Sequence, residues 1–108
     1  MQVLITATFS RTQSIREKIV NDVEIEDYGF RVVLQKRRDR RPGWAKITSL
    51  REGRFGAINI EWDSGVNLLT CRVITKDWTS PWPIIGDFIT YLFERYEKVI
   101  EAVNIYPR

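Results

Sequence analysis

The residues best suited to binding chemistry form a basic cluster in the middle of the chain. The cluster comprises Lys36, Arg37, Arg38, Arg40, Arg41, Trp44 and Lys46. Closely spaced guanidinium groups can contact successive phosphates and release counterions, and a neighbouring indole can stack on an exposed base. The same composition is also typical of a solvated or protein-docking loop, and Pro42-Gly43 marks this segment as a turn. These seven residues are therefore candidate contacts for nucleic acid or for a protein partner.

Catalytic chemistry has few candidates in this sequence. Histidine is missing, which removes the commonest general base and the commonest metal ligand, and excludes Ser-His and Cys-His catalysts. Glu61 and Asp63 form a carboxylate pair beside a turn, a position typical of solvated side chains. The single cysteine, Cys71, falls on the predicted core face, as a structural thiol does. We therefore predict that the protein is not an enzyme and uses no cofactor or metal.

The length and composition predict one domain spanning residues 1–108. One cysteine allows no intramolecular disulfide, which favours a reducing compartment. The apolar segment 2–9 lacks the basic region of a signal peptide, and no run approaches the ~20 apolar residues of a membrane span. We expect a cytoplasmic location and no membrane partner. The net charge of +3 is unevenly placed, with eight basic residues in 36–54 and five acidic ones in 17–27.

Alternating apolar residues predict strands over 2–9, 30–36, 44–50, 55–62 and 66–75, with a short possible strand at 23–26. Residues 10–20 fit either a short helix capped by Thr12 or Ser14, or an irregular crossover. A helical pattern begins at Ser80 and continues to about Val103, before Pro107.

Two hairpin turns fix the register of the three central strands. The turn at 52–53 sets Ala45 opposite Ile60, and the turn at 64–65 sets Ile60 opposite Leu69. Both registers place one apolar set on a single face: Ala45, Ile47, Ile58, Ile60, Trp62, Leu69, Cys71 and Val73. Because an exposed helical stripe would cost more than a domain's net stability, the helix must cover this face. The sequence therefore predicts an α+β fold of two layers, a mostly antiparallel sheet of about five strands with a long C-terminal helix packed on one face.

The opposite sheet face combines aromatic, aliphatic and basic residues. It is predicted to carry Arg31, Trp44, Lys46, Leu50, Phe55, Asn59, Leu68, Arg72 and Ile74. Among these, Phe55, Leu68, Arg72 and Ile74 are the candidate interface residues. The face fits a dimer interface, a base-stacking platform, or a surface buried beneath residues 10–27.

Three functions are consistent with these patterns. We expect a non-enzymatic interaction module that self-associates, or binds a protein partner, through the sheet face opposite the helix. The alternative is a nucleic-acid-binding domain that uses the basic loop 36–43 and the adjacent aromatic residues. A second alternative is a small-ligand carrier or a histidine-independent enzyme, which requires an unfilled cavity between helix and sheet.

Overall fold

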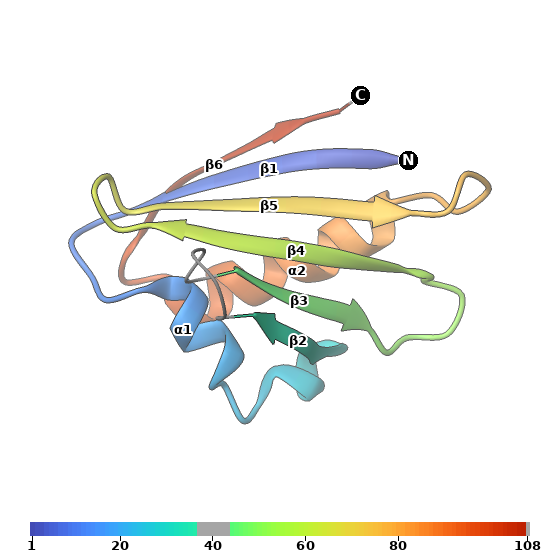
Figure 1. Cartoon of the computed structure of the whole chain (residues 1–108), viewed down its shortest axis with the longest axis horizontal. Coiled ribbons are helices and arrows are strands. Elements are labelled where there is room, and N and C mark those ends of the chain that lie inside the picture. The colour runs from blue at the N-terminus through green and yellow to red at the C-terminus, as the bar shows by residue number, and fades with distance from the viewer. Residues whose placement is uncertain (37–43, 108) are drawn as a thin grey trace.

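The computed structural model describes residues 1–36 and 44–107. These residues form a strand-rich layer backed by helices (Figure 1). In chain order the elements are β1 (Gln2–Phe9), α1 (Ile15–Val20), the 3-10 helix η1 (Ile25–Tyr28), β2 (Phe30–Lys36), β3 (Trp44–Ser49), β4 (Gly56–Asp63), β5 (Leu68–Thr75), α2 (Trp82–Tyr96) and β6 (Ile100–Tyr106).

The strands form one sheet in the order β2-β3-β4-β5-β1-β6, and each neighbouring pair is antiparallel. Helix α2 crosses behind the sheet in Figure 1 and packs against that face. The predicted two-layer α+β class is confirmed. The part of the chain that the structure describes contributes six strands, one more than the approximate number expected.

The hairpin between β3 and β4 closes as the sequence predicts. The Arg54 backbone N–H donates to the Arg51 carbonyl over 3.2 Å. Ala45 lies opposite Ile60 in the resulting ladder. The register read from the turn at Glu52-Gly53 is therefore confirmed.

The register of β4 and β5 differs from the predicted one by two residues. Ile60 lies opposite Cys71 instead of Leu69, because the chain reverses over residues 64–67 and not over 64–65 alone. Asn67 has a φ of 53°, in the left-handed region that Asn tolerates better than most residues. Since side chains alternate with a period of two, a shift of two keeps every side chain on its predicted face.

The sheet face covered by α2 carries the core. The core between this face and α2 includes these fully buried side chains: Ile5, Ile47, Ile58, Ile60, Leu69 and Cys71 from the sheet, and Ile84, Phe88 and Leu92 from α2. Phe88 packs edge-on against Phe30 from β2, with 6.0 Å between ring centroids. Each large side chain removed from water contributes roughly 1.5–3 kcal/mol gross, so this face holds the two layers together. The predicted assignment of Ile47, Ile60 and Cys71 to the interior is confirmed.

The segment between β1 and β2 is helical, which resolves one open alternative and corrects another expectation. Ser14 caps α1 by accepting a hydrogen bond from the Glu17 N–H over 3.1 Å. The short strand expected at 23–26 is wrong, because η1 occupies this region. The Asp22 carboxylate accepts from the Glu24 N–H, and Gly29 ends the 3-10 turn with a φ of 89°. Local side-chain bonding therefore outcompetes strand pairing here.

The predicted C-terminal end of the helix is also wrong. Helix α2 ends at Tyr96, where the Val99 N–H donates back to the Tyr96 carbonyl, and residues 100–106 then form strand β6. The apolar residues Val99, Ile100 and Val103 suit either period. Pairing with the open edge of β1 decides in favour of the strand.

Candidate interaction surface

The sheet has one face that α2 does not contact, and we call it the outer face. Ile15 and Ile19 of α1 and Ile25 of η1 are buried in the same core cluster as Phe88 of α2. All three helices thus pack on the inner side. The possibility that residues 10–27 cover the outer face is therefore wrong. None of the helices in the described residues covers that face.

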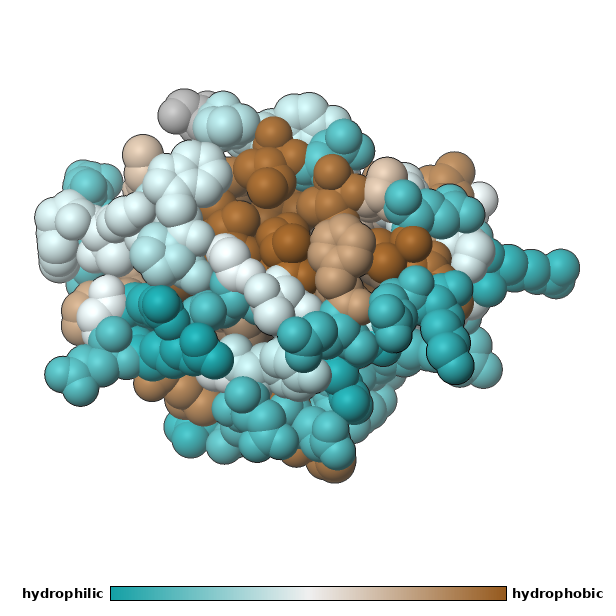
Figure 2. All heavy atoms as spheres, turned by 180° about the vertical axis from the view of Figure 1, so that it is seen from behind, coloured by the Kyte–Doolittle hydropathy of each residue, from teal (hydrophilic) through white to brown (hydrophobic). Residues whose placement is uncertain are grey.

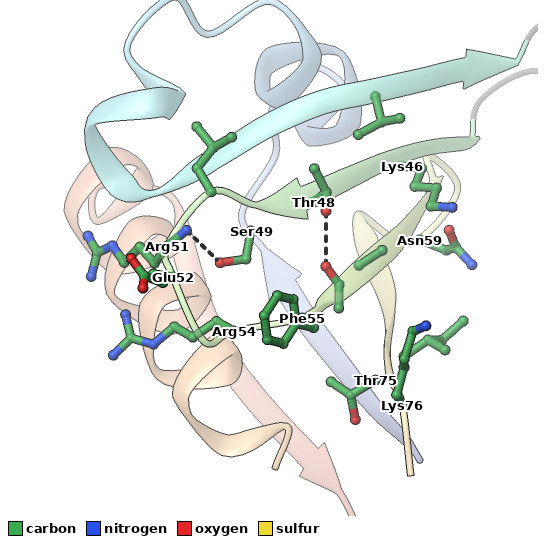
Figure 3. A pocket seen from close by; sticks show the side chains of 15 residues that line it. Lys46, Thr48, Ser49, Arg51, Glu52, Arg54, Phe55, Asn59, Thr75 and Lys76 are labelled. Atoms are coloured by element: carbon green, nitrogen blue, oxygen red, sulfur yellow. Dashed lines mark hydrogen bonds between the residues drawn. The ribbon is translucent and has the colours of Figure 1, made fainter. Parts of the chain in front are cut away.

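A hollow of about 700 Å³ lies at one end of the outer face (Figure 3). Its floor is low because Ala57, which ends in a methyl group, lies between the longer side chains of Thr48 and Ile74 across the ladder. The connection between β3 and β4 forms its wall. Phe55 from this connection remains 59% exposed and Ile74 42% exposed, so the hollow offers apolar surface to solvent.

The wall of the hollow is anchored to α2 by ion pairs. The Arg51 and Arg54 guanidinium groups donate to the two carboxylate oxygens of Asp87 over 3.0 Å and 2.9 Å. Figure 3 shows both arginine side chains extending toward the helix. Within the connection, the Arg51 N–H donates to Ser49 Oγ over 3.3 Å. The segment that carries Phe55 is therefore held in place by these hydrogen bonds and ion pairs.

The four candidate interface residues do not lie together. Phe55 and Ile74 both line the hollow. Arg72 lines a second, smaller hollow of about 280 Å³ with Trp44, and its guanidinium lies 3.9 Å from a Glu61 carboxylate oxygen. Leu68 is half-buried at the opposite end of β5, opposite Asp63. The apolar part of the outer face is thus concentrated around Phe55.

The structure locates part of the predicted basic cluster. Trp44 and Lys46 project from the outer face, each half-buried, and the Lys36 backbone pairs with Trp44 at the end of β2. The remaining members, Arg37, Arg38, Arg40 and Arg41, lie outside the described residues. Arg31 also belongs to the outer face and lies 3.6 Å from the Glu26 carboxylate. Two of the described basic residues of this face, Arg31 and Arg72, therefore lie near a carboxylate.

A polar network that the sequence does not reveal surrounds Asp22. Its side chain is 3% exposed and accepts hydrogen bonds from Tyr91 Oη at 2.8 Å and from Arg95 Nη2 at 3.0 Å. Arg95 Nη1 donates to Glu24 at 3.0 Å, and Tyr96 Oη lies 3.0 Å from Tyr91 Oη. Because these residues are far apart in sequence, spacing gives no signal for the network.

The protonation states of this network are set by burial and by hydrogen bonds. Burial alone would raise the pKa of Asp22, but hydrogen bonds from the Glu24 N–H, Tyr91 and Arg95 outweigh it and hold that pKa below its usual value. Burial, together with Tyr96 and Asp22, strongly raises the pKa of Tyr91. Asp22 is therefore ionised and Tyr91 protonated at neutral pH, so the network ties α2 to the segment after α1.

The other candidates for chemistry lie in ordinary structural positions. Cys71 is fully buried, and burial raises the pKa of its thiol. Asp63 accepts a hydrogen bond from the Gly65 N–H in the β4–β5 connection. Arg16 is buried and its Nη2 donates to Glu17 over 2.8 Å, whereas its buried Nε and Nη1 have no hydrogen-bond partner among the described residues. Arg16 lines neither hollow of the outer face. Across residues 1–36 and 44–107, His, Cys, Asp and Glu side chains form no group of three that could hold a metal ion.

None of the helices in the part of the chain that the structure describes is long and apolar enough to cross a membrane. Comparison with known proteins adds no further assignment. No family model matches the sequence, no curated protein matches it significantly, and no solved structure matches the fold significantly.

Proposed function

We propose that this protein is a non-catalytic interaction module that self-associates through the outer face of its sheet, with the contact centred on the hollow beside Phe55. It acts in the cytoplasm without a cofactor. The observation that carries the proposal is the exposure of Phe55 and Ile74 within one hollow on an uncovered sheet face. Apolar patches with a polar rim are typical of protein contact sites.

The energetics favour burial of this patch. Placing one more large apolar side chain in a dry contact stabilises an association by roughly 1.5–3 kcal/mol before entropic costs. Phe55 is held by a connection that is already braced through Arg51, Arg54 and Asp87. Association therefore orders little additional chain, which lowers its entropic cost.

The placement of titratable groups supports a non-catalytic role. Among the described residues whose pKa is shifted, Asp22, Tyr28, Tyr91, Arg95 and Tyr96 lie in or beside the network behind the sheet, and Cys71 lies in the core. None of these groups lines the hollow. Perturbed groups converging in a cleft are the usual mark of acid–base catalysis, and the hollow lacks that mark within residues 1–36 and 44–107.

The test is to measure the molar mass by size-exclusion chromatography with light scattering over a wide concentration range. The wild-type chain should exceed its monomer mass of 12.8 kDa. Phe55→Glu should lower the molar mass relative to the wild type at the same concentration, because the contact would bury a carboxylate. Val66→Glu is the matched control, since Val66 is 63% exposed and lies in the β4–β5 connection at the other end of the sheet. A wild-type chain that is monomeric at every concentration would contradict the proposal.

Nucleic-acid binding is the second candidate. The observation that favours it is the grouping of Trp44, Lys46 and Arg72 on the outer face, next to the ends of the 37–43 segment. Binding would weaken steeply as salt rises. Replacing Arg37, Arg38, Arg40 and Arg41 with Ala should reduce both the affinity and the salt slope for mixed single-stranded nucleic acid, and an unchanged slope would rule this candidate out.

A further inference from the structure

Strand β6 is an edge of the sheet that nothing protects within the described residues. It pairs with β1 on one side only and is the last strand in the sheet order. The outward N–H and C=O groups of an edge strand form a template for another strand. The opposite edge, β2, carries a bulge between Val32 and Leu34 and the exposed charged residue Arg31, which discourage pairing. Between Glu101 and Pro107, β6 has no charged residue and no proline.

An apolar strip of α2 lies next to this edge. Trp82, Ile85, Ile89 and Phe93 follow one another at helical spacing on the flank of α2 opposite Tyr91, whose hydroxyl contacts Asp22 near the β2 side of the sheet. This strip lies on the side of β6. Figure 2, seen from behind the sheet of Figure 1, shows a continuous hydrophobic patch on this face of the molecule.

Two side chains of β6 extend the strip onto the sheet. Val103 lies opposite Ala7 and Ile105 opposite Ile5, so both share the inner face with the core. Val103 is half-buried and Ile105 is 40% exposed. The open edge and the α2 strip therefore form one surface, which we call the edge surface.

We propose that the edge surface binds a second copy of this chain, with β6 pairing antiparallel to β6 of the partner around a two-fold axis near Asn104. The two sheets then continue into one, and the two α2 helices lie next to each other on the same side. In this register Val103 faces Ile105 of the other copy on the inner side. On the outer side Ala102 faces Tyr106, a small residue against a large one.

The sequence of β6 favours a second copy over an unrelated strand. A two-fold pairing sets each residue opposite a residue of the same segment, and like charges facing each other destabilise a strand pair. The uncharged run 102–106 avoids this conflict in the pairing centred on Asn104. A two-fold contact also uses the same patch on both copies, as most homodimers do.

The area of the surface is compatible with a stable dimer. Trp82 is 47% exposed, Phe93 44% and Tyr106 50%. Since burying an aromatic side chain removes about 150–250 Å² from water, these exposed parts amount to roughly 200–350 Å² per copy. A typical interface buries about 800 Å² per partner. The backbone edge of seven residues and the exposed parts of Ile89, Val103 and Ile105 would supply the remainder.

This contact is separate from the one at the hollow, although both rest on self-association. The hollow lies on the outer face near Phe55, whereas the edge surface lies on the inner side beyond β1. The two contacts can therefore be tested independently, and either can be present without the other.

Disulfide trapping tests the edge surface directly. Cys71 is fully buried and should not form intermolecular disulfides. A disulfide-linked dimer therefore reports on the position of the single introduced cysteine. The matched set is Asn104→Cys at the edge, Asn59→Cys on the outer face and Asn21→Cys at an exposed position distant from both. Under mild oxidation, Asn104→Cys should give several-fold more crosslinked dimer than Asn21→Cys. Crosslinking of Asn59→Cys reports only on the outer-face contact.

The register has its own test. A mixture of Ala102→Cys and Tyr106→Cys chains should form a heterodimeric disulfide, and adding Asn104→Lys to both chains should remove it by setting two charges opposite each other. Stronger crosslinking at 102, 104 or 106 than at Asn21 supports edge pairing. Crosslinking of all three only at the Asn21→Cys level would overturn it, whatever Asn59→Cys shows.

Discussion

Tyr91 Oη donates a hydrogen bond to Asp22 Oδ2 over 2.8 Å, and this contact joins helix α2 to the segment that follows α1. The two residues are 69 positions apart. Arg95, one turn along α2, adds a charge-assisted hydrogen bond to the other Asp22 carboxylate oxygen. The covering layer of the sheet is therefore held together by a buried carboxylate as well as by apolar packing.

Asp22→Asn should lower the free energy of unfolding by about 2 kcal/mol at neutral pH, the usual effect of losing hydrogen bonds to a charged group. The folded protein holds the pKa of Asp22 below its ordinary value. This stabilisation is therefore present above the unfolded pKa of about 3.9 and is lost as the pH falls through the folded pKa.

Urea denaturation of the wild type and of Asp22→Asn between pH 7 and pH 2 checks this expectation. The difference between the two proteins should shrink in acid. Asp27→Asn is the control, because Asp27 is exposed in the neighbouring 3-10 turn. Equal stability of Asp22→Asn and wild type at pH 7 would show that the network is not stabilising.

Two glycines with positive φ should respond differently to alanine. Gly29 has a φ of 89°, and a Cβ there would lie 2.5 Å from Arg51 Nε; Gly53 has a φ of 81° and open space around it. Both substitutions incur the left-handed backbone cost of about 1–2 kcal/mol. Gly29→Ala also displaces Arg51, whose Nη1 donates to Asp87.

We therefore expect Gly29→Ala to be the less stable of the two variants by about 1 kcal/mol, the size of a typical hydrogen-bond contribution. Chemical denaturation of both variants measures the difference. If Gly53→Ala proves equally destabilised, Arg51 moves aside without loss and its bond to Asp87 contributes little.

The sequence predicts the faces of the sheet better than its connections. Period-two alternation assigns Ile47, Ile60 and Cys71 to the interior, and the structure agrees. The sequence predicts the β4–β5 register wrongly, because Ser64-Gly65 by itself fits a two-residue hairpin turn. In the folded chain the Asn67 carbonyl accepts the Phe9 N–H over 3.1 Å, a contact from a distant strand that extends the connection to 64–67.

For the candidate site as well, the sequence predicts which face carries the residues but not the hollow that they form. Alternation places Phe55 and Ile74 on the outer face, and both line the hollow. The hollow itself depends on Ala57 lying between Thr48 and Ile74, which requires the register of three strands. The sequence predicts that the helix continues into the start of β6, because the apolar spacing there suits both periods. Pairing with the open edge of β1 decides in favour of the strand.

Cys71 should not react with thiol reagents in the native protein. Its side chain is fully buried, and burial raises the thiol pKa, so the reactive thiolate is scarce. Labelling should become complete only in denaturant, where the thiol is exposed. Rapid labelling of the native wild type would contradict the burial and would remove the basis of the disulfide experiment. The Asn21→Cys variant is the positive control, since Asn21 is exposed and lies outside both proposed contacts.

Self-association is tested most directly by amide hydrogen exchange at two protein concentrations, one low and one high. We expect slower exchange at the high concentration around Phe55 in the β3–β4 connection, and an independent slowing over residues 102–106 of β6. The buried strand β5 should serve as an internal reference that does not change. Identical exchange at both concentrations around Phe55 would contradict the proposed contact.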